Sequence, residues 1–572
     1  MPSDRSTGRR SLALTCAAAL VVALTSGGLA MPVAFENAIL GGGLSPDSIE
    51  HLAIAHAWVH GAGFVDPVQY HYYLSQSVPL PALAVRAPVV SVLAAIPLAA
   101  GATLPTVIVV LAVWSALIAG AAFLVACRFM RRRAAAAAVL LFTASTSWLF
   151  LAATPLNEVT ATAALLLVLA SAGGVTRSAP RALLCSIATL LAWLTRPTLG
   201  ALVLAVVAAA VWELGPRAAL RSRSLRSYAV GFFAGWAIVQ IVVKNSTGVG
   251  IYAGYGVASQ MLSPQDLWHY GIPYAGTWAF VQTHATEITA TIGVRAWQLF
   301  EALCLGGKFN YAGWLVPAAV AYGLLRPRDG ILFHRINVFA LLGFAAIVVA
   351  NYSAFDGNRY PLLVAVPACF SGMAMLDVAA LRLERRLRGG SLEWLGAIAS
   401  ALPLLAVVLF FVAEPLAHRA PELPRAWAGY RSSTRWLPAV HGHGTPLRRL
   451  CDHIDADAVV AASNPWEIVL LCGNAAVRLP IAPSSPELRD QFIAERGSRY
   501  IVLYQWRRIF FPERTEPWKE SLEDSERFEK IHETGPYLLY EVVGQPPGDP
   551  WRAPPPLVCA GRGPACGKPT ER

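Results

Sequence analysis

Two carboxylates in one short acidic segment are the residues whose types and spacing best suit acid–base chemistry. Asp47 and Glu50 lie in residues 45–51, which read SPDSIEH. Ser45 is a favourable N-cap and proline suits the first helical position, so a helix is predicted to begin here. The two carboxylates would then lie three residues apart on one side of the helix. The positive end of the helix dipole favours an ionised Asp47, which is the state that a general base requires.

A plainer interpretation is that both acids only stabilise and solubilise the start of this helix. That interpretation explains one carboxylate more easily than two, and His51 and His56 follow on the next turns. We therefore treat Asp47 as the candidate general base and Glu50 as a second candidate catalytic residue.

A third acid and two arginines stand beside apolar runs on the same predicted side of the membrane. Glu158 follows Asn157 at the start of one run. Arg196 lies in a tight turn before a proline, and Arg359 opens another run with Tyr360. Arginines on the outer side are unusual, because membrane proteins concentrate their basic residues in cytoplasmic connectors. We therefore predict that Arg359 binds a phosphate, with a second contribution from Arg196.

Each of these residues also has a simpler explanation. Glu158 would be an ordinary helix-start acid with Asn157 as its N-cap. The arginines would extend to the lipid headgroups and anchor the helix ends.

The composition is that of a multi-pass membrane protein. The 572 residues are 55% hydrophobic and only 14% charged, against about 25% charged in a typical soluble protein. Before the C-terminal part, most of the basic residues fall in every second connector between the predicted spans, so they lie on one side of the membrane. This is the positive-inside pattern. The net charge of +11 therefore orients helices and does not imply binding of nucleic acid.

The nine cysteines include no close Cys-x-x-Cys pair, so no zinc-type spacing is present. Four of them fall in the region predicted to lie outside, where disulfides are allowed, namely Cys451, Cys472, Cys559 and Cys566.

The hydropathy pattern predicts eleven membrane-spanning helices within residues 1–414. The apolar run Leu12–Val33 would be a signal peptide on the alternative interpretation, but it exceeds a typical signal segment, so we expect a retained helix with a cytoplasmic N-terminus. The other predicted spans are Thr106–Cys127, Ala134–Ala152, Val159–Gly174, Ala182–Thr195, Leu199–Leu214, Ser227–Val243, Tyr311–Leu325, Ile336–Ala350, Tyr360–Ala380 and Trp394–Ala413.

Two long outer segments separate some of these spans. Residues 34–105 hold the acidic turn, whose helix should stop at Gly61-Ala62-Gly63. Tyr70, Tyr72 and Tyr73 suit the headgroup level, and Pro88–Gly101 is predicted to be re-entrant or interfacial. Residues 244–311 form the second outer segment, with an interfacial helix expected over Thr286–Phe300.

The C-terminal part is predicted to be an extracytoplasmic α/β domain, residues 415–544, followed by a disordered tail, residues 545–572. Pro486–Arg496 is predicted as a helix. The predicted strands are Ala458–Ala462, Ile468–Leu471, Ala475–Leu479, Tyr500–Tyr504 and Tyr537–Val543.

The order of these features resembles the GT-C membrane glycosyltransferases, which include the protein O-mannosyltransferases and the lipid A aminoarabinose transferase. The resemblance rests on one span, an outer acidic turn at Asp47 and a Gly-x-Gly-Phe at Gly61–Phe64, then the prolines Pro79, Pro81 and Pro88. The later outer-edge elements are similar as well, at residues 154–158 (TPLNE), 195–198 (TRPT) and 358–361 (NRYP). Residues 461–480 and 499–503 are similar to soluble domains that end many bacterial members.

The resemblance implies a GT-C-like fold in the cell membrane and a sugar donor linked to polyprenyl phosphate. Asp47 would act as base on an extracytoplasmic acceptor that is a glycan, lipid or protein, with inversion at the anomeric carbon. Arg359 would lie near the phosphate, with Tyr360, Arg196 and His51 as further substrate contacts, and Glu158 would be a second acid.

The sequence departs from the family pattern beside Asp47. Many relatives have a second acid next to the first, or a tyrosine four residues on, where this chain has Ser48 and His51. We therefore expect no obligatory metal or other cofactor.

Three other functions remain open at this point. A transporter would place charges along a path through the spans, and this chain has almost none there. A glycan ligase or polymerase would use a diphosphate-linked donor. A non-catalytic assembly partner would need none of these acids for chemistry.

Overall fold

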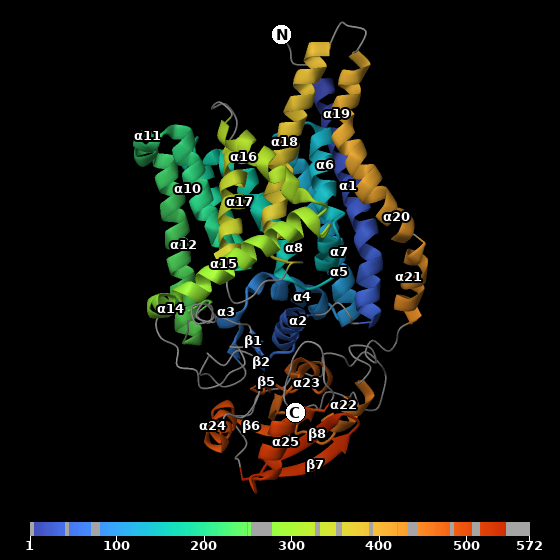
Figure 1. Ribbon diagram of the computed structural model, residues 1–572, viewed down its shortest axis with the longest axis vertical. Helices are drawn as coiled ribbons and strands as arrows, with labels where there is room; N and C mark the ends of the chain where they lie inside the picture. Colours follow the sequence, from blue (N-terminus) through green and yellow to red (C-terminus); the bar gives the residue numbers. More distant parts are fainter. Residues whose placement is uncertain are drawn as a thin grey trace.

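The protein consists of a helical bundle with an α/β domain at one end (Figure 1). The computed structural model describes residues 5–40, 45–69, 80–248, 250–252, 277–325, 332–350, 357, 359–387, 393–419, 421–432, 444–480, 485–505 and 515–544. The predicted interfacial tyrosines Tyr70, Tyr72 and Tyr73 and the predicted tail, residues 545–572, lie outside these residues.

Eight helices among the described residues are long and apolar enough to cross a membrane, or nine if one bent pair forms a single span. The eight are Leu12–Asn37, Leu104–Ala126, Asn157–Gly174, Pro197–Leu214, Arg223–Thr247, Leu332–Ala350, Leu362–Leu387 and Trp394–Arg419.

The expected number of eleven spans is not confirmed. Residues 132–143 and 146–152 form two helices that meet at an angle of 72°. The helices Ala179–Thr195 and Ala312–Leu324 are apolar but have at most 17 residues, whereas a straight crossing needs about 20. The last span also continues to Arg419, six residues beyond its expected end at Ala413.

The bundle is built from the following elements. Its helices are α1 (Arg5–Leu40), α5 (Leu104–Ala126), α6 (Arg132–Thr143), α7 (Thr146–Ala152), α8 (Asn157–Ser171), α9 (Ala179–Thr195), α10 (Ala201–Leu214), α11 (Pro216–Arg221), α12 (Arg223–Thr247), α16 (Val316–Leu325), α17 (Leu332–Ala350), α18 (Leu362–Leu387), α19 (Glu393–Val407), α20 (Glu414–Arg419) and α21 (Glu422–Ser432). Short 3₁₀ or π-helical turns are η1 (Ala172–Gly174), η2 (Pro197–Gly200), η4 (Glu301–Leu305), η5 (Ala312–Leu315) and η6 (Val408–Ala413).

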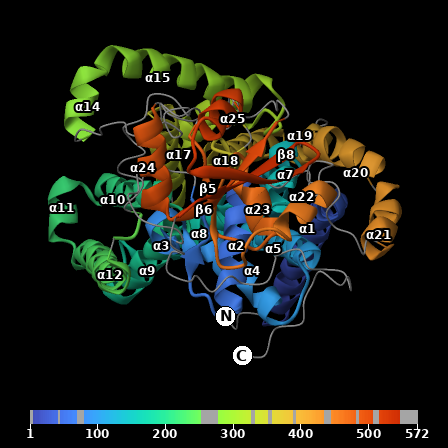
Figure 2. The ribbon, with the colours of Figure 1, turned by 90° about the horizontal axis from the view of Figure 1, so that it is seen from below.

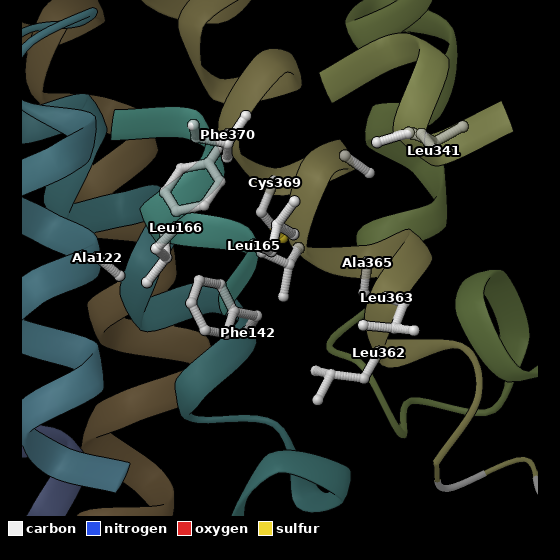
Figure 3. Close-up of a cluster of buried hydrophobic side chains, with 14 of the residues drawn as sticks. Ala122, Phe142, Leu165, Leu166, Leu341, Leu362, Leu363, Ala365, Cys369 and Phe370 are labelled. Carbon is white, nitrogen blue, oxygen red and sulfur yellow. The ribbon is translucent and has the colours of Figure 1, made fainter. Parts of the chain in front are cut away.

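A single large apolar cluster holds the middle of the bundle together. Phe142 of α6 lies edge-on to Phe370 of α18, with ring centroids 6.0 Å apart. Leu165 and Leu166 of α8 join them in this cluster (Figure 3). Interlocked aromatic and aliphatic side chains fix how α6, α8 and α18 sit relative to one another, which matters because α8 and α18 lead into the candidate site.

The first outer segment forms a compact layer at one end of the bundle, called the α2 end below. It contains α2 (Pro46–Val59), α3 (Ala82–Val85), α4 (Pro88–Ala99), and the short strands β1 (Val65–Asp66), β2 (Val68–Gln69) and β3 (Leu80–Pro81). The predicted helix of the acidic turn is therefore present, and Gly61 and Gly63 follow it with φ of 82° and 94°. The opposite end of the bundle carries α11 and is called the α11 end (Figure 1).

The second outer segment contributes α14 (Thr277–Thr283) and α15 (Ala285–Phe300). The helix expected over Thr286–Phe300 is thus observed, and Figure 2 shows it along the outside of the bundle.

The C-terminal domain contains a six-stranded sheet in the order β2-β5-β4-β6-β8-β7. The pairs β2–β5, β5–β4 and β4–β6 are parallel, whereas β6–β8 and β8–β7 are antiparallel. Its elements are α22 (Gly444–Cys451), β4 (Val459–Ala462), α23 (Pro465–Leu471), β5 (Ala476–Arg478), α24 (Pro486–Arg496), β6 (Ser498–Tyr504), α25 (Thr515–Glu523), β7 (Phe528–Thr534) and β8 (Tyr537–Val542).

One predicted strand of this domain is wrong. Residues 468–471 belong to the helix α23, which begins with Pro465 at its first position. All of α23 is buried, and a short, fully apolar run reads equally well as a buried strand or a buried helix.

The edge strand β2 comes from the first outer segment and not from the C-terminal domain. Val68 and Gln69 pair with Ala476 and Val477 of β5. Apolar residues of α2, among them Ile49 and Leu52, share a buried cluster with residues of the sheet. The α/β domain therefore packs directly against the helix that carries Asp47.

A disulfide joins Cys451 at the end of α22 to Cys472 at the end of α23. The bond closes a loop with a sequence separation of 21 residues. Since α23 packs against α2 and the bond ties α23 to α22, the support of α2 depends in part on it.

We predict that the double substitution Cys451→Ser/Cys472→Ser destabilises the α/β domain by about 2–4 kcal/mol, because the unfolded chain regains loop entropy. Thermal unfolding of the purified full chain would show a lower midpoint for the variant. Reductant should lower the wild-type midpoint and leave that of the variant unchanged. Cys16→Ser, which changes an exposed free cysteine, is the matched control. Equal midpoints for wild type and the double variant would contradict the prediction.

Candidate active site

The acidic turn begins α2 as the sequence predicts. The Ser45 hydroxyl accepts a hydrogen bond from the Ser48 backbone N–H at 3.3 Å, and Pro46 takes the first helical position. This cap fixes the first turn, so Asp47 and Glu50 face the same neighbour.

That neighbour is Arg86, in the connection between α3 and α4. Its Nη2 lies 2.8 Å from Oδ1 of Asp47, and its guanidinium also donates to Glu50. The side chain of Asp47 keeps 22% of its surface exposed, whereas that of Glu50 is fully buried. Of the two carboxylates in the acidic turn, only Asp47 is thus open to a substrate.

A second arginine connects Asp47 with the third candidate acid. Arg359 precedes α18, and its Nη1 lies 2.6 Å from Oδ2 of Asp47. Its Nε donates to Oε1 of Glu158 at 2.9 Å. The same Glu158 oxygen accepts from Nη1 of Arg196 at 2.6 Å.

These contacts form an alternating chain of charges, called the arginine–carboxylate network below: Glu50, Arg86, Asp47, Arg359, Glu158 and Arg196. Five separate parts of the sequence supply it. Five of its six members are candidate site residues from the sequence. Arg86 is the exception, because it lies in an irregular stretch whose pattern gives no sign of its neighbours; the only signal was an outward-facing arginine.

The arginines set the charge of Asp47. Burial alone would raise the pKa of Asp47, but Arg86 and Arg359 outweigh it and hold that pKa well below its usual range. Asp47 is therefore ionised at neutral pH. The charged neighbours likewise outweigh burial at Arg359 and hold its pKa well above the usual range.

Glu50 and its neighbour Asp66 behave differently. Burial raises the pKa of Glu50 well above its usual range, and the nearby charges of Asp66 and Asp47 add to the effect. Burial also raises the pKa of Asp66 to about 7, against the pull of Arg86. Both groups share Arg86 with Asp47, and one guanidinium does not compensate three carboxylates in a buried site.

His51 holds the site in place through both of its ring nitrogens. Nδ1 lies 3.0 Å from the Ser91 hydroxyl, and Nε2 lies 3.2 Å from the side-chain nitrogen of Asn157. Burial and the nearby Arg86 lower the pKa of His51 to about 3, so the ring is neutral. The assignment of His51 to phosphate binding stays a prediction, and a neutral ring adds no charge to it.

Tyr360 lies under the guanidinium of Arg196, 5.2 Å from the ring centroid. A cavity of about 30 Å³ opens beside them, lined by Thr198 and by apolar side chains of α17 and α18. A cationic end with an apolar wall suits an anion that carries a hydrocarbon chain.

Several buried oxygen atoms around the network have no hydrogen-bond partner among the described residues: Oε1 of Glu50, Oε2 of Glu158, Oδ1 of Asn157 and Oγ1 of Thr198. Buried polar atoms normally have partners, so each exception calls for an explanation, such as a water, an ion or a catalytic role. These atoms mark the same region as the network.

Within the described part of the chain, no group of three or more His, Cys, Asp or Glu is arranged to hold a metal ion. The carboxylates of Asp47 and Glu158 each contact two arginines, which suits an anion better than a cation. The expectation that no metal is obligatory stays a prediction.

Comparisons with known proteins find similarity among solved structures alone. No family model matches the chain, and no curated protein matches it. ArnT from Cupriavidus metallidurans, bound to undecaprenyl phosphate, is 14% identical, with 94% of this chain and 99% of ArnT covered and a TM-score of 0.48. The arabinofuranosyltransferase AftD from Mycobacteria is 14% identical, with 93% and 40% covered and a TM-score of 0.41.

The oligosaccharyltransferase of Archaeoglobus fulgidus is 13% identical, with 86% of this chain and 69% of that protein covered and a TM-score of 0.46. Similarity this distant does not assign an activity, which has to be argued from the site.

We predict that Asp66 makes the stability of the protein depend on pH between about 4 and 7. In this range the folded protein binds the Asp66 proton more tightly than the unfolded chain does, because the pKa rises from 3.8 to about 7. Stability should therefore fall as pH rises, by up to about 4 kcal/mol. Asp66→Asn imitates the neutral form and keeps an acceptor for the Val68 N–H.

Thermal unfolding at pH 5 and pH 8 checks this prediction. The Asp66→Asn variant should exceed wild type slightly at pH 5 and by clearly more at pH 8. Asp452→Asn, at an exposed position, is the matched control and should follow wild type at both values. A variant that loses stability with pH as steeply as wild type would show that Asp66 is not the titrating group.

Proposed function

We propose that this chain is an inverting glycosyltransferase that moves a sugar from a polyprenyl-phosphate donor to an extracytoplasmic acceptor. The observation that carries the proposal is the bridge that Arg359 makes between Asp47 and Glu158. It joins an ionised, partly exposed carboxylate to a cluster of arginines at the α2 end of the bundle, where the phosphate and the acceptor would meet.

The charge of the site supports a phosphate ligand. Arg86, Arg196 and Arg359 converge on the carboxylates of Asp47 and Glu158. Arginine presents several N–H donors in one plane, which matches the oxygens of a phosphate. A phosphate beside Arg359 would lie within one side chain of Asp47, and this is the proximity that transfer requires.

The exposure of Asp47 supports its role as the base. Two arginines hold its pKa low in the absence of donor, so it is ionised but weakly basic. Donor phosphate would take over part of the charge of Arg86 and Arg359 and so raise the pKa of Asp47. Binding of the donor would therefore prepare the base for the acceptor.

The transfer step then follows from these roles. The acceptor hydroxyl oxygen forms a bond to the anomeric carbon of the sugar, and its proton passes to the Asp47 carboxylate. The bond between the anomeric carbon and the phosphate oxygen breaks on the opposite face, so the configuration inverts. The arginines stabilise the negative charge that develops on the departing polyprenyl phosphate.

The cavity next to Tyr360 suggests where the polyprenyl chain would begin. Its apolar wall consists of Phe344, Ile347, Val348 and Leu363. At about 30 Å³ it holds no more than a water-sized group. Entry of a prenyl chain would therefore require α17 and α18 to separate at the α2 end.

The first test is sugar transfer in reconstituted vesicles, with a panel of polyprenyl-phosphate sugars as donors and native lipid and glycan extracts as acceptors. Asp47→Asn keeps the size of the side chain and removes the base, so we expect the rate to fall by about 10²- to 10⁴-fold. Asp452→Asn, at an exposed position of the α/β domain, is the matched control and should keep wild-type activity.

Two results would overturn the proposal or part of it. Full transfer by folded Asp47→Asn would remove Asp47 as base and shift attention to Glu50 or Glu158. Transfer only from diphosphate-linked donors would favour a ligase or polymerase.

We also predict that a chelator leaves the transfer rate of the wild-type chain unchanged. The reason is that the carboxylates of Asp47 and Glu158 are engaged by arginines, which leaves little attraction for a divalent cation. The measurement compares initial rates in EDTA, in EDTA with excess Mg²⁺ or Mn²⁺, and without additions. Loss of activity in EDTA that either metal restores would show the prediction to be wrong.

A further inference from the structure

A second polar region lies at the α11 end of the bundle, away from the arginine–carboxylate network. It is a cavity of about 800 Å³, called the basic cavity below. The ends of α5, α8, α9, α10 and α17 surround it. Its volume falls within the range of about 300–1,000 Å³ that is typical of sites for small ligands.

The charge of the basic cavity is strongly positive. Arg128, Arg177 and Arg181 line it, and none of the three has an ion-pair partner in the described ranges. The one carboxylate in the lining, Glu213, is paired with Arg335. The cavity therefore offers positive charge to an anion without a competing acid in the lining.

The backbone keeps two of these arginines in place. A tight turn joins α8 to α9, and in it Gly174 packs directly against Arg181, so that a side chain at position 174 would collide with residue 181. Arg177 and Arg181 both line the cavity at this turn. Gly173 is exposed beside them, with open space where a Cβ would stand.

Another part of the wall is apolar. Phe129 and Phe333 stack with ring centroids 3.8 Å apart, and the guanidinium of Arg128 lies 5.9 Å from the Phe129 ring centroid. Leu169 and Leu184 continue this wall toward the middle of the bundle. An entirely soluble anion gains nothing from such a wall, whereas a phosphate that carries acyl chains contacts both parts.

We propose that the basic cavity binds the phosphate headgroup of an anionic phospholipid in the leaflet at the α11 end. The arginines would contact the phosphate, and the aromatic pair would contact the glycerol and the first methylene groups. The inference does not depend on the proposed function.

The lipid would also touch helices that reach the candidate active site. The helix α8 lines the basic cavity at one end and carries Glu158 at the other, and α9 leads to Arg196. Occupation of the cavity would therefore stabilise the same helices that position Glu158 and Arg196, two of the six members of the arginine–carboxylate network.

The test compares lipid binding by the full chain in nanodiscs of phosphatidylcholine, with phosphatidylglycerol added in increasing amounts. Bound phosphatidylglycerol is counted by native mass spectrometry. Arg177→Gln/Arg181→Gln should bind the anionic lipid about 30-fold more weakly than wild type, given the usual contribution of a basic residue at a membrane surface. Arg217→Gln/Arg223→Gln is the matched control, because both arginines are exposed near the α11 end, do not line the cavity, and remove the same charge.

A second variant keeps the arginines and blocks the site. Gly173→Glu places a carboxylate beside Arg177, where space is open, and should also abolish the specific binding. Both variants should keep the wild-type unfolding midpoint in pure phosphatidylcholine.

Three outcomes would overturn the inference. Equal weakening by the cavity variant and the control would mean that the arginines act only through general surface charge. Full binding by Gly173→Glu would place the lipid elsewhere. Inorganic phosphate that displaces the lipid completely, and binds as tightly by itself, would make this a site for a soluble anion.

Discussion

The pairing of Arg359 with two carboxylates from different helices is the interaction on which the rest of the α2 end depends. Asp47 and Glu158 begin separate helices, and neither would remain charged at a buried membrane edge without a partner. Loss of one member of such a group leaves an uncompensated charge that costs about 3–5 kcal/mol. The bundle must therefore bring α2, α8 and the start of α18 to one point.

The sequence predicted those parts of the site that rest on local rules. Ser45 and Pro46 start a helix for reasons contained within a few residues, and the site residues on it follow directly. Arg359 and Glu158 were each identified from their predicted place on the outer side of the membrane. Their contact was beyond prediction, because it joins residues 201 positions apart and depends on how α8 and α18 pack.

Arg86 shows more clearly what could not be predicted from the sequence. It lies between two short helices in a stretch without a regular apolar pattern, and its only signal in the sequence is a basic residue on the predicted outer side. Its importance comes from three carboxylates that surround it in space, Asp47, Glu50 and Asp66. The error at residues 468–471 has a similar origin, since a short apolar run leaves both a buried strand and a buried helix open.

The strand β2 is synthesised early, but its partner β5 is synthesised late. Ribosomes make proteins from the N-terminus, so Val68 and Gln69 leave the ribosome long before their partners in β5. The sheet that supports α2 is complete only after the whole membrane bundle has been inserted. Premature termination before β5 would therefore yield a protein whose acidic turn lacks this support.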